Sequence, residues 1–305
     1  MRTTVTSTGE RSSINESIPA RITVERVGGR VRLTDLSGGT YLRAQPLGVR
    51  GDTARVALVG TYALLLTGDH LRMEITVGRG VWLELVEPSG VVAYDTRGAG
   101  PASWRADLRV GDGGCLVWRS APFVVSAGAD VTRRTRVDVA GSGRALVHET
   151  LVLGRSYEAA GGPLRSSVEG RVDGRPVLVE DLDLRGPGSA EVPGVMGGHR
   201  VLASTFLLGA RPERASGPGE TLLHGPGALA RALAGQAHEA ESAVAGTWEN
   251  WKAAFADPSG YEGRAGGPSA TSDRRQGAKP VRHSSRNRVS SPVANSRTVV
   301  NPWSR

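Results

Sequence analysis

The sequence predicts a mostly β protein of stacked strand pairs, a β-helix-like arrangement of multi-stranded sheets, with a small helical part near the C-terminal end. Short runs rich in Val, Leu and Ile recur between Gly, Pro and Asp, and the 42 glycines among 305 residues disfavour long helices. Three segments of similar length each contain a strand, a glycine turn and a second strand. Helical periodicity is confined to residues 236–256.

The first strands follow a polar leader. Residues 1–18 are rich in Ser, Thr and Glu, which predicts a flexible segment. From Arg21, "RITVERV", a Gly28-Gly29 turn and "RVRLTDL" predict a hairpin, and further strands are expected at 40–47 and 53–59.

A degenerate repeat follows. The segments "MEITVGRGVWLELVEP", "ADLRVGDGGCLVWRSAP" and "TRVDVAGSGRALVHET" have turns near Gly78, Gly111 and Ala140 and predict three consecutive hairpins. Each unit is expected to bury its apolar face against the next, so that the units stack. In the first unit Leu71 to Val77 alternate apolar and polar residues, which predicts one buried and one wetter face.

The last elements are a hairpin, a strand and a helix. Residues 164–172 and 176–184 flank the turn at Asp173-Gly174, and "HRVLASTFLLG" predicts one more strand. Within 236–256 the apolar residues recur at steps of three and four, which places them on the face of a helix that docks on the sheet: Ala237, Ala240, Val244, Trp248, Trp251 and Phe255. We therefore expect a β-rich domain over 19–256.

The basic charge lies mainly in the C-terminal tail. The formal net charge is +8, but residues 257–305 contain nine Lys and Arg against three Asp and Glu, so the remainder is nearly neutral. This tail lacks periodicity and is expected to be disordered. The sequence contains no nucleic-acid-binding motif and no strand of aromatic and Arg residues that would stack bases. Nucleic acid is therefore not an expected partner.

The remaining composition predicts a cytoplasmic protein that does not enter a membrane. The single cysteine, Cys115, forms no intramolecular disulfide and supplies no thiolate cluster. The N-terminal residues lack the apolar core of a signal peptide, and the longest near-apolar run, "VALVGTYALLL", is too short to span a bilayer.

The common catalytic motifs are missing. The sequence has no G-x-x-x-x-G-K-[ST] phosphate loop and no G-x-S-x-G nucleophile elbow, and "HETL" at 148 supplies only the first two letters of H-E-x-x-H. We therefore expect a protein that is not an enzyme.

Ionisable residues are scattered on or beside the predicted strands: Asp69, His70, Glu84, Glu87, His148, Glu149, Glu180 and Asp181. Each one singly is best explained as a polar residue on the wet face of a half-buried strand. Gathered together and hydrated, carboxylates with an occasional imidazole would bind Ni²⁺ weakly enough for passage. The sequence alone leaves open which face they occupy.

The motifs resemble one family. "TGDHLRMEITVGRGVWLEL", "VGDGGCLVWRSAP", "LVHETLVLGR" and "DGRPVLVEDLDL" are similar, in order and spacing, to those of the D/H-type urease accessory proteins, UreD. The likeness runs from about Leu42 to the Trp248 and Trp251 helix, and the strand ending in "LVLGR" and the later hairpin are its most specific parts. The chain departs from the family at "YALLLTGD", which lacks the early glycines, and at "EPSGVVAYDT", which lacks a lysine.

The resemblance implies a non-enzymatic scaffold or chaperone in urease maturation. Such proteins bridge apo-urease subunits to an F-type accessory protein and, through it, to a G-type GTPase that carries nickel. No cofactor is bound permanently, and nickel is in transit. The family's acidic positions along an internal metal route fall on Asp69, Glu149 and Glu180, with His70 and His148 beside two of them.

Two other hypotheses remain open. A metal-dependent hydrolase would use His70, His148 and His199 with Glu149, although the spacing does not favour it. A β-rich interaction module without a metal role, as in a diverged homologue, would leave the polar strand residues facing solvent.

Overall fold

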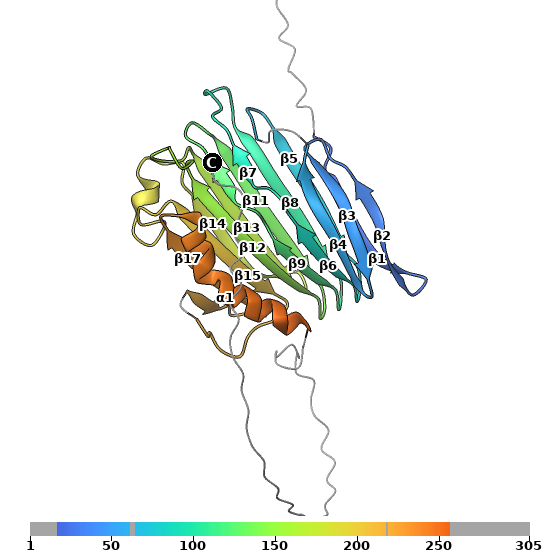
Figure 1. The fold of residues 1–305 in the computed structure, drawn as a ribbon. Coiled ribbons are helices and arrows are strands. Elements are labelled where there is room, and N and C mark those ends of the chain that lie inside the picture. The colour runs from blue at the N-terminus through green and yellow to red at the C-terminus, as the bar shows by residue number, and fades with distance from the viewer. Residues whose placement is uncertain (1–16, 62–64, 218, 257–305) are drawn as a thin grey trace, which may run out of the picture. The chain divides into compact units, whose positions relative to one another are not determined.

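The computed structural model describes residues 17–61, 65–217 and 219–256, which form two β-sheets, one α-helix and one short 3₁₀ helix (Figure 1). The seven-stranded sheet contains, in spatial order, β14 (Arg175–Asp183), β13 (Leu164–Val172), β11 (Val131–Val139), β8 (Ala102–Val110), β5 (His70–Val77), β1 (Ala20–Val27) and β2 (Arg30–Ser37).

The second sheet has ten strands. Eight of them lie in the order β16 (Glu220–Leu222), β17 (Gly227–Ala234), β15 (Val201–Leu208), β12 (Arg144–Leu153), β9 (Cys115–Arg119), β6 (Trp82–Val86), β4 (Thr53–Gly60) and β3 (Leu42–Arg50). Two short strands, β7 (Val91–Ala93) and β10 (Phe123–Val125), pair with each other, and β10 also pairs with β12. A short 3₁₀ helix, η1 (Ser189–Glu191), precedes β15.

The predicted stacking is confirmed, but the three repeat segments are not hairpins. In each segment the first strand lies in the seven-stranded sheet and the second in the ten-stranded sheet. The glycine turn therefore carries the chain from one sheet to the other, and each strand pairs in parallel with its equivalent in the next coil. A tight turn can join two antiparallel strands of one sheet, whereas parallel neighbours need a longer crossover connection. A strand, glycine turn and strand pattern is therefore compatible either with a hairpin in one sheet or with a corner between two sheets.

The hairpins predicted outside the repeat are confirmed. β1 pairs antiparallel with β2 through Gly28 and Gly29, which both have positive φ, and β13 pairs antiparallel with β14 through Asp173 and Gly174. β3 and β4 form a third antiparallel pair, with a bulge between Pro46 and Gly48. These pairs flank the stack of coils at its two ends.

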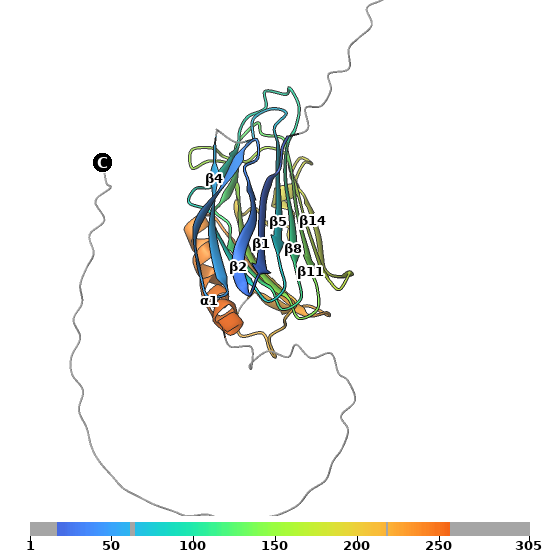
Figure 2. The ribbon, with the colours of Figure 1, turned by 90° about the vertical axis from the view of Figure 1, so that its right-hand side faces the viewer.

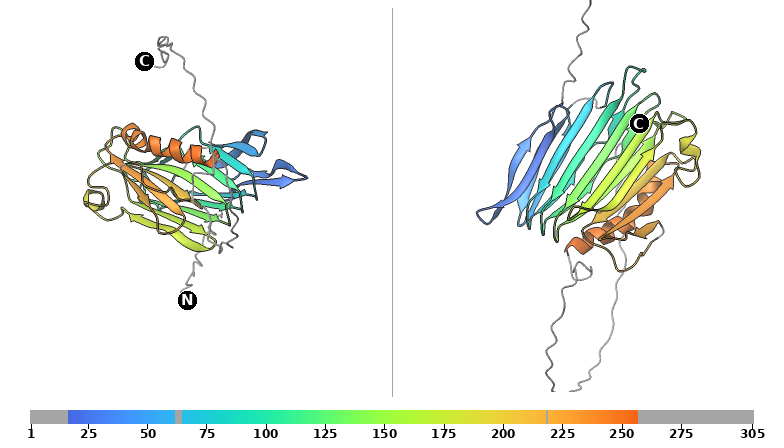
Figure 3. Two further views of the ribbon diagram at one scale, coloured as in Figure 1. Left: turned by 90° about the horizontal axis from the view of Figure 1, so that it is seen from below. Right: turned by 180° about the vertical axis from the view of Figure 1, so that it is seen from behind.

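The core lies between the two sheets. Because the parallel strands are in register, inward side chains form rows across the seven-stranded sheet, and one such row joins Ile75, Leu108 and Val137. Leu83 and Leu116 form an opposing row on the second sheet. Figure 2 shows the sheets edge-on as two layers, and Figure 3 shows the seven-stranded sheet from behind.

The helix α1 (Ala237–Ala256) covers the outer face of the ten-stranded sheet over β15, β17 and β12 (Figures 1 and 2). The predicted apolar stripe is confirmed, since Ala240, Val244, Trp248 and Trp251 are buried in one cluster with residues of that sheet. The side chain of Phe255, predicted on the same stripe, lies outside the described residues.

Most of the predicted leader and the whole predicted tail lie outside the described residues. The first described residue is Ser17, whose hydroxyl donates to the carbonyl of His70. Within the described part of the chain, no helix has the length and apolar character needed to cross a membrane.

Candidate functional site

One row of inward residues breaks the apolar pattern between the sheets. Leu71, Trp104, Arg133 and Ser166 occupy equivalent positions on β5, β8, β11 and β13. Arg133 therefore points into the core at 2% exposure, facing β12 of the opposite sheet. An unpaired guanidinium at this depth would be very costly, so the surrounding residues must supply acceptors.

Glu149 on β12 provides these acceptors. Its Oε2 accepts a 2.9 Å hydrogen bond from Nη1 of Arg133, its Oε1 accepts from Nη2, and Thr135 Oγ1 donates to Oε1 at 2.8 Å. The pair is bidentate and the Glu149 side chain is only 5% exposed. This geometry explains how a strand of Leu, Val and Thr accommodates a buried carboxylate.

Aromatic rings enclose the guanidinium of Arg133. Its central carbon lies 4.4 Å from the ring centroid of Trp104 and 5.6 Å from that of Phe123. Trp104 in turn stacks on Trp118, with ring centroids 6.1 Å apart. The faces of these rings attract a desolvated cation, so they offset part of the cost of burying it.

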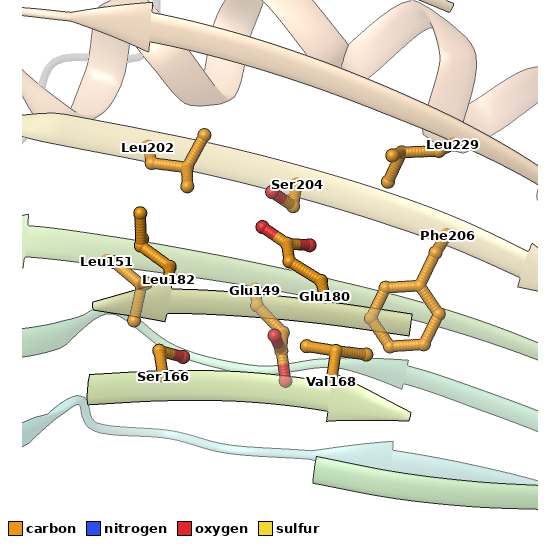
Figure 4. Close-up of a pocket in the computed structure, with 10 residues that line it drawn as sticks. All are labelled: Glu149, Leu151, Ser166, Val168, Glu180, Leu182, Leu202, Ser204, Phe206 and Leu229. Atoms are coloured by element: carbon orange, nitrogen blue, oxygen red, sulfur yellow. The ribbon is translucent and has the colours of Figure 1, made fainter. Parts of the chain in front are cut away.

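A narrow cavity of about 20 Å³ opens beside this ion pair, large enough for about one water molecule. We call it the inter-sheet cavity; its lining comprises Glu149, Leu151, Ser166, Val168, Glu180, Leu182, Leu202, Ser204, Phe206 and Leu229 (Figure 4). In Figure 4 the carboxylate of Glu180 is directed toward Ser204, whereas that of Glu149 is directed toward the strand that carries Ser166 and Val168. The structure thus brings two of the predicted route residues to one cavity.

Glu180 also faces the surface. It forms an ion pair with Arg231 of β17 and lines a second hollow of about 620 Å³, the outer cleft, whose lining also includes Asp181, Asp183, Val195 and Leu233. The inter-sheet cavity and the outer cleft share Glu180, Leu182 and Leu202. Burial lowers the pKa of Arg231, an effect that the charge of Glu149 opposes.

Glu87 lies on the other side of the aromatic group. Its carboxylate accepts 3.0 Å hydrogen bonds from Nε1 of Trp118 and from the N–H of Ala121, and it lines a cavity of about 20 Å³ with Met73 and Trp104. Burial raises the pKa of Glu87 to about 7, against the lowering effect of those two donors and of Arg133.

His148 faces away from the inter-sheet cavity, although it precedes Glu149 directly. Its Nδ1 lies 2.9 Å from Oγ1 of Thr205 and its Nε2 lies 3.1 Å from Oγ1 of Thr150. Its ring makes an edge contact with Trp248 of α1. Burial lowers the pKa of His148 to about 4, helped by Arg119 and opposed by Glu149.

The remaining predicted site residues lie elsewhere. Asp69 accepts hydrogen bonds from the hydroxyl of Tyr41 at 2.9 Å and from the N–H of Leu66 at 2.8 Å. The imidazole of His70 lies on the outer face of the seven-stranded sheet, with Nδ1 2.8 Å from Oγ of Ser103. Neither residue is among those that line the inter-sheet cavity or the outer cleft.

The geometry does not assemble the hydrolase site. His70 lies outside one sheet, His148 lies under α1, His199 is exposed before β15, and Glu149 points between the sheets. Among the residues that the structure describes, no group of three or more His, Cys, Asp or Glu side chains is arranged to hold a metal ion.

Arg133 and Arg231 are the functional candidates that the sequence analysis missed. The alternation along β11 predicts that Arg133 is buried, since it shares one face of the strand with Val131, Thr135 and Val137. No local pattern distinguishes Arg231, because Glu180 is 51 positions away in the sequence and lies in the other sheet.

Comparison with known proteins identifies the family. The family described as UreD urease accessory protein matches residues 19–265. The chain is 46% identical over 235 residues to urease accessory protein UreD 1 of Streptomyces griseus, which covers 77% of this chain and 91% of the relative. It is 34% identical to UreD of Streptomyces avermitilis, over 70% of this chain and 86% of the relative, and 34% identical to UreD of Cereibacter sphaeroides, over 70% and 80%. The motifs, the stacked β coils and these similarities agree, and the chain belongs to the UreD family of urease accessory proteins.

Proposed function

We propose that this protein is a non-enzymatic, cytoplasmic scaffold in urease maturation. In this role it bridges apo-urease subunits to an F-type accessory protein and, through it, to a G-type GTPase, and it helps to deliver nickel to the urease active site. Membership of the UreD family supports the maturation role. The position of Glu180, shared by the inter-sheet cavity and the outer cleft, is the observation that supports a metal route.

The chemistry of this arrangement suits transient binding. Carboxylates are acceptable but weak ligands for Ni²⁺ compared with imidazole or thiolate clusters, so a cation that meets them is not held permanently. Arg231 neutralises Glu180 while no cation is present, and its long side chain can move aside because the pair lies near the cleft, with side-chain exposures of 34% and 22%. We propose that nickel passes through the outer cleft and is handed on at Glu180.

A complementation assay tests the maturation role. Cells that lack their own D-type protein receive urease, the other accessory proteins, nickel, and either this chain or an empty vector. We expect the chain to restore urease activity. Soluble expression without any restored activity would contradict the maturation role.

The route is tested by Glu180→Ala in the same cells. We expect normal protein levels and reduced nickel content of the purified urease. The control is Glu169→Ala, which removes a carboxylate from the outer face of β13 that pairs with Arg171 and Arg134. Equal nickel loading with both variants would refute the route while leaving the scaffold role intact.

One observation favours the scaffold role without a metal route. The carboxylate of Glu149 already accepts three hydrogen bonds from Arg133 and Thr135, so it has little capacity left for a cation. If Glu180→Ala leaves nickel loading unchanged, the polar residues between the sheets serve the fold, and the protein acts in maturation through its surfaces alone.

A further inference from the structure

The ion pair between Glu180 and Arg231 stands where the outer cleft meets the inter-sheet cavity. On β17, Leu229, Arg231 and Leu233 are directed between the sheets, because successive side chains of a strand point to opposite faces and the alanines between them lie under α1. Leu229 lines the inter-sheet cavity, whereas Arg231 and Leu233 line the outer cleft. Glu180 reaches the pair from β14 of the other sheet, so the pair lies between the two hollows.

The backbone of Arg231 is fixed, whereas its side chain is held at a single point. The N–H of Arg231 donates to the carbonyl of Gly219 at 3.1 Å, and a Cβ at Gly219 would clash with the carbonyl of Arg231. The Nη2 of Arg231 donates to Oε2 of Glu180, and its Nε is buried without a hydrogen-bond partner among the residues that the structure describes. Arg133, by contrast, binds Glu149 through two nitrogens. Arg231 is therefore the more easily displaced of the two buried arginines.

This position is costly for the guanidinium of Arg231. A buried donor without an acceptor loses the hydrogen bond that it makes in water, and burial also lowers the pKa of Arg231 because its charge is poorly solvated. The side chain is 34% exposed and borders the outer cleft, so a rotation into the cleft hydrates the whole guanidinium. The attraction of Glu180 opposes this rotation. The side chain is therefore released when another cation neutralises Glu180.

The other two carboxylates that line the outer cleft have partners on the solvent side. Asp181 pairs with Arg165, and Asp183 pairs with Arg185. All four of these side chains are nearly half exposed, so displacing either arginine uncovers no passage to the interior. Glu180 is thus the cleft carboxylate whose cation separates the cleft from the space between the sheets.

The sizes of the two hollows limit how far a hydrated cation travels. The inter-sheet cavity of about 20 Å³ has room for about one water molecule, so a cation with a full shell of water does not fit. The outer cleft of about 620 Å³ is large enough for such an ion. A cation therefore meets Glu180 from the cleft side, where the guanidinium of Arg231 lies.

We propose that Arg231 is a charge-selective gate, which a divalent cation opens by replacing the guanidinium on Glu180. A monovalent metal cation has the same charge as the guanidinium and lacks its N–H donors, so it does not displace Arg231. Ni²⁺ has twice the charge and coordinates carboxylate oxygens directly. The gate rests on the proposed function for the arrival of nickel at the cleft, and it adds the class of ion that is admitted and the residue that selects it.

The gate predicts how Arg231 variants bind a cation. A site that is open in about one tenth of the molecules binds its ligand about tenfold more weakly than a site that is always open. Arg231→Gln removes the competing charge and leaves Glu180 open, so this variant should bind Ni²⁺ more tightly than the wild type. Arg231→Lys keeps a competing positive charge and should stay close to the wild type.

A Ni²⁺ titration of the full-length protein, followed by methyl NMR in potassium chloride, tests the gate. Leu182 and Leu202 line both hollows, so their methyl signals report a paramagnetic ion beside Glu180 and not one bound to a distant histidine. The proteins are the wild type, Arg231→Gln, Arg231→Lys and the double variant Glu180→Gln with Arg231→Gln. Melting temperatures establish that each variant is folded.

The matched control is Arg171→Gln. Arg171 and Glu169 form an ion pair with side-chain exposures of 36% and 21%, against 34% and 22% for Arg231 and Glu180. The control pair lies on the outer face of β13, away from both hollows. It therefore reports the effect of losing an equally exposed arginine that guards no cavity.

We expect Arg231→Gln to respond at a Ni²⁺ concentration at least about tenfold below that of the wild type. Arg171→Gln should match the wild type, and the double variant should lose the gain. Equal responses of the wild type and Arg231→Gln would overturn the gate, as would a double variant that keeps the gain. In the wild type, Ni²⁺ should also shift the Nε–Hε signal of Arg231, whereas added K⁺ should not; an unmoved signal while the leucine methyl groups respond to Ni²⁺ would overturn the gate without any variant.

The gate and the proposed function can fail separately. If the titrations show the gate but Glu180→Ala leaves the nickel content of urease unchanged in cells, the route fails and the gate remains a property of the isolated protein. If Arg231→Gln titrates as the wild type does while Glu180→Ala lowers nickel loading, the route stands and the gate is wrong.

Discussion

Removing Arg133 should destabilise the protein strongly, because it leaves a charged carboxylate buried between the sheets. In Arg133→Met the side-chain volume is largely kept, but Glu149 loses the two guanidinium donors and retains only the Thr135 hydroxyl. Both partners are nearly inaccessible, with side-chain exposures of 2% and 5%, so solvent does not screen the charge. Breaking a buried pair in this way costs about 3–5 kcal/mol of unfolding free energy.

Removing both partners should recover most of that stability. In the double variant Arg133→Met with Glu149→Leu, no charge is buried, and the new side chains pack among Trp104 and Phe123. The Thr135 hydroxyl then lacks its acceptor, which leaves a residual cost of about 1–3 kcal/mol. The expected result is therefore a double variant that is more stable than Arg133→Met.

Urea unfolding of the full chain, followed by tryptophan fluorescence, measures these differences by linear extrapolation. The cycle comprises the wild type, Arg133→Met, Glu149→Leu and the double variant, and equal m-values are needed before the free energies are compared. A cost below about 1 kcal/mol for Arg133→Met would refute the assignment of a desolvated ion pair. A double variant whose cost equals the sum of the two single costs would also refute it.

Three further predictions follow from individual residues. Burial raises the pKa of Glu87 from 4.5 in the unfolded chain to about 7 in the fold. The free energy of unfolding should therefore fall by up to about 3 kcal/mol as the pH rises from 4.5 to 7. Urea unfolding of Glu87→Gln over the same pH range should not show this fall. Burial lowers the pKa of His148 from 6.5 in the unfolded chain to about 4 in the fold, so the neutral ring contributes to stability above pH 6.5 and this contribution is lost as the pH falls toward 4. Carbon-detected NMR should show a neutral ring at pH 6. A protonated ring at that pH would contradict its burial. Gly209→Ala should lower the melting temperature more than Gly174→Ala. Both glycines have positive φ, but a Cβ at 209 would clash with the carbonyl of Gly143, whereas a Cβ at 174 would meet open space. Equal shifts of the melting temperature would contradict this contact.

Much of the fold could be predicted from local patterns. Alternation identified the buried face of β5, where Leu71, Met73, Ile75 and Val77 are all buried. Helical spacing identified the side of α1 that packs on the sheet. These predictions succeeded because periodicity reports directly which side of an element contacts the core.

The connectivity could not be predicted from the same patterns. A glycine turn between two strands permits either a hairpin within one sheet or a corner between two sheets, and the alternation of the flanking residues is the same in both cases. The choice depends on whether neighbouring coils offer parallel partners in register, as β8 does for β5. That information is distributed over residues about one coil apart, so it is not contained in any single segment.

The site shows a similar division between local and long-range information. The alternation of β12 requires His148 and Glu149 to face opposite sides of one sheet, but it does not show that both sides are buried. Burial follows from tertiary structure, since α1 covers one face and β11 lies against the other. On β12, His148 therefore contacts the helix on one face of the sheet, and Glu149 pairs with Arg133 between the sheets on the other face.

This division determines which variants can test the metal route. Glu149 already accepts three hydrogen bonds and is buried, so its replacement would destabilise the fold, and lower urease maturation for that reason, whether or not nickel passes it. Glu180 forms one ion pair and is partly exposed where the inter-sheet cavity meets the outer cleft. A loss of nickel loading in a Glu180 variant of normal stability therefore reports on the route, whereas the same loss in a Glu149 variant reports first on the fold.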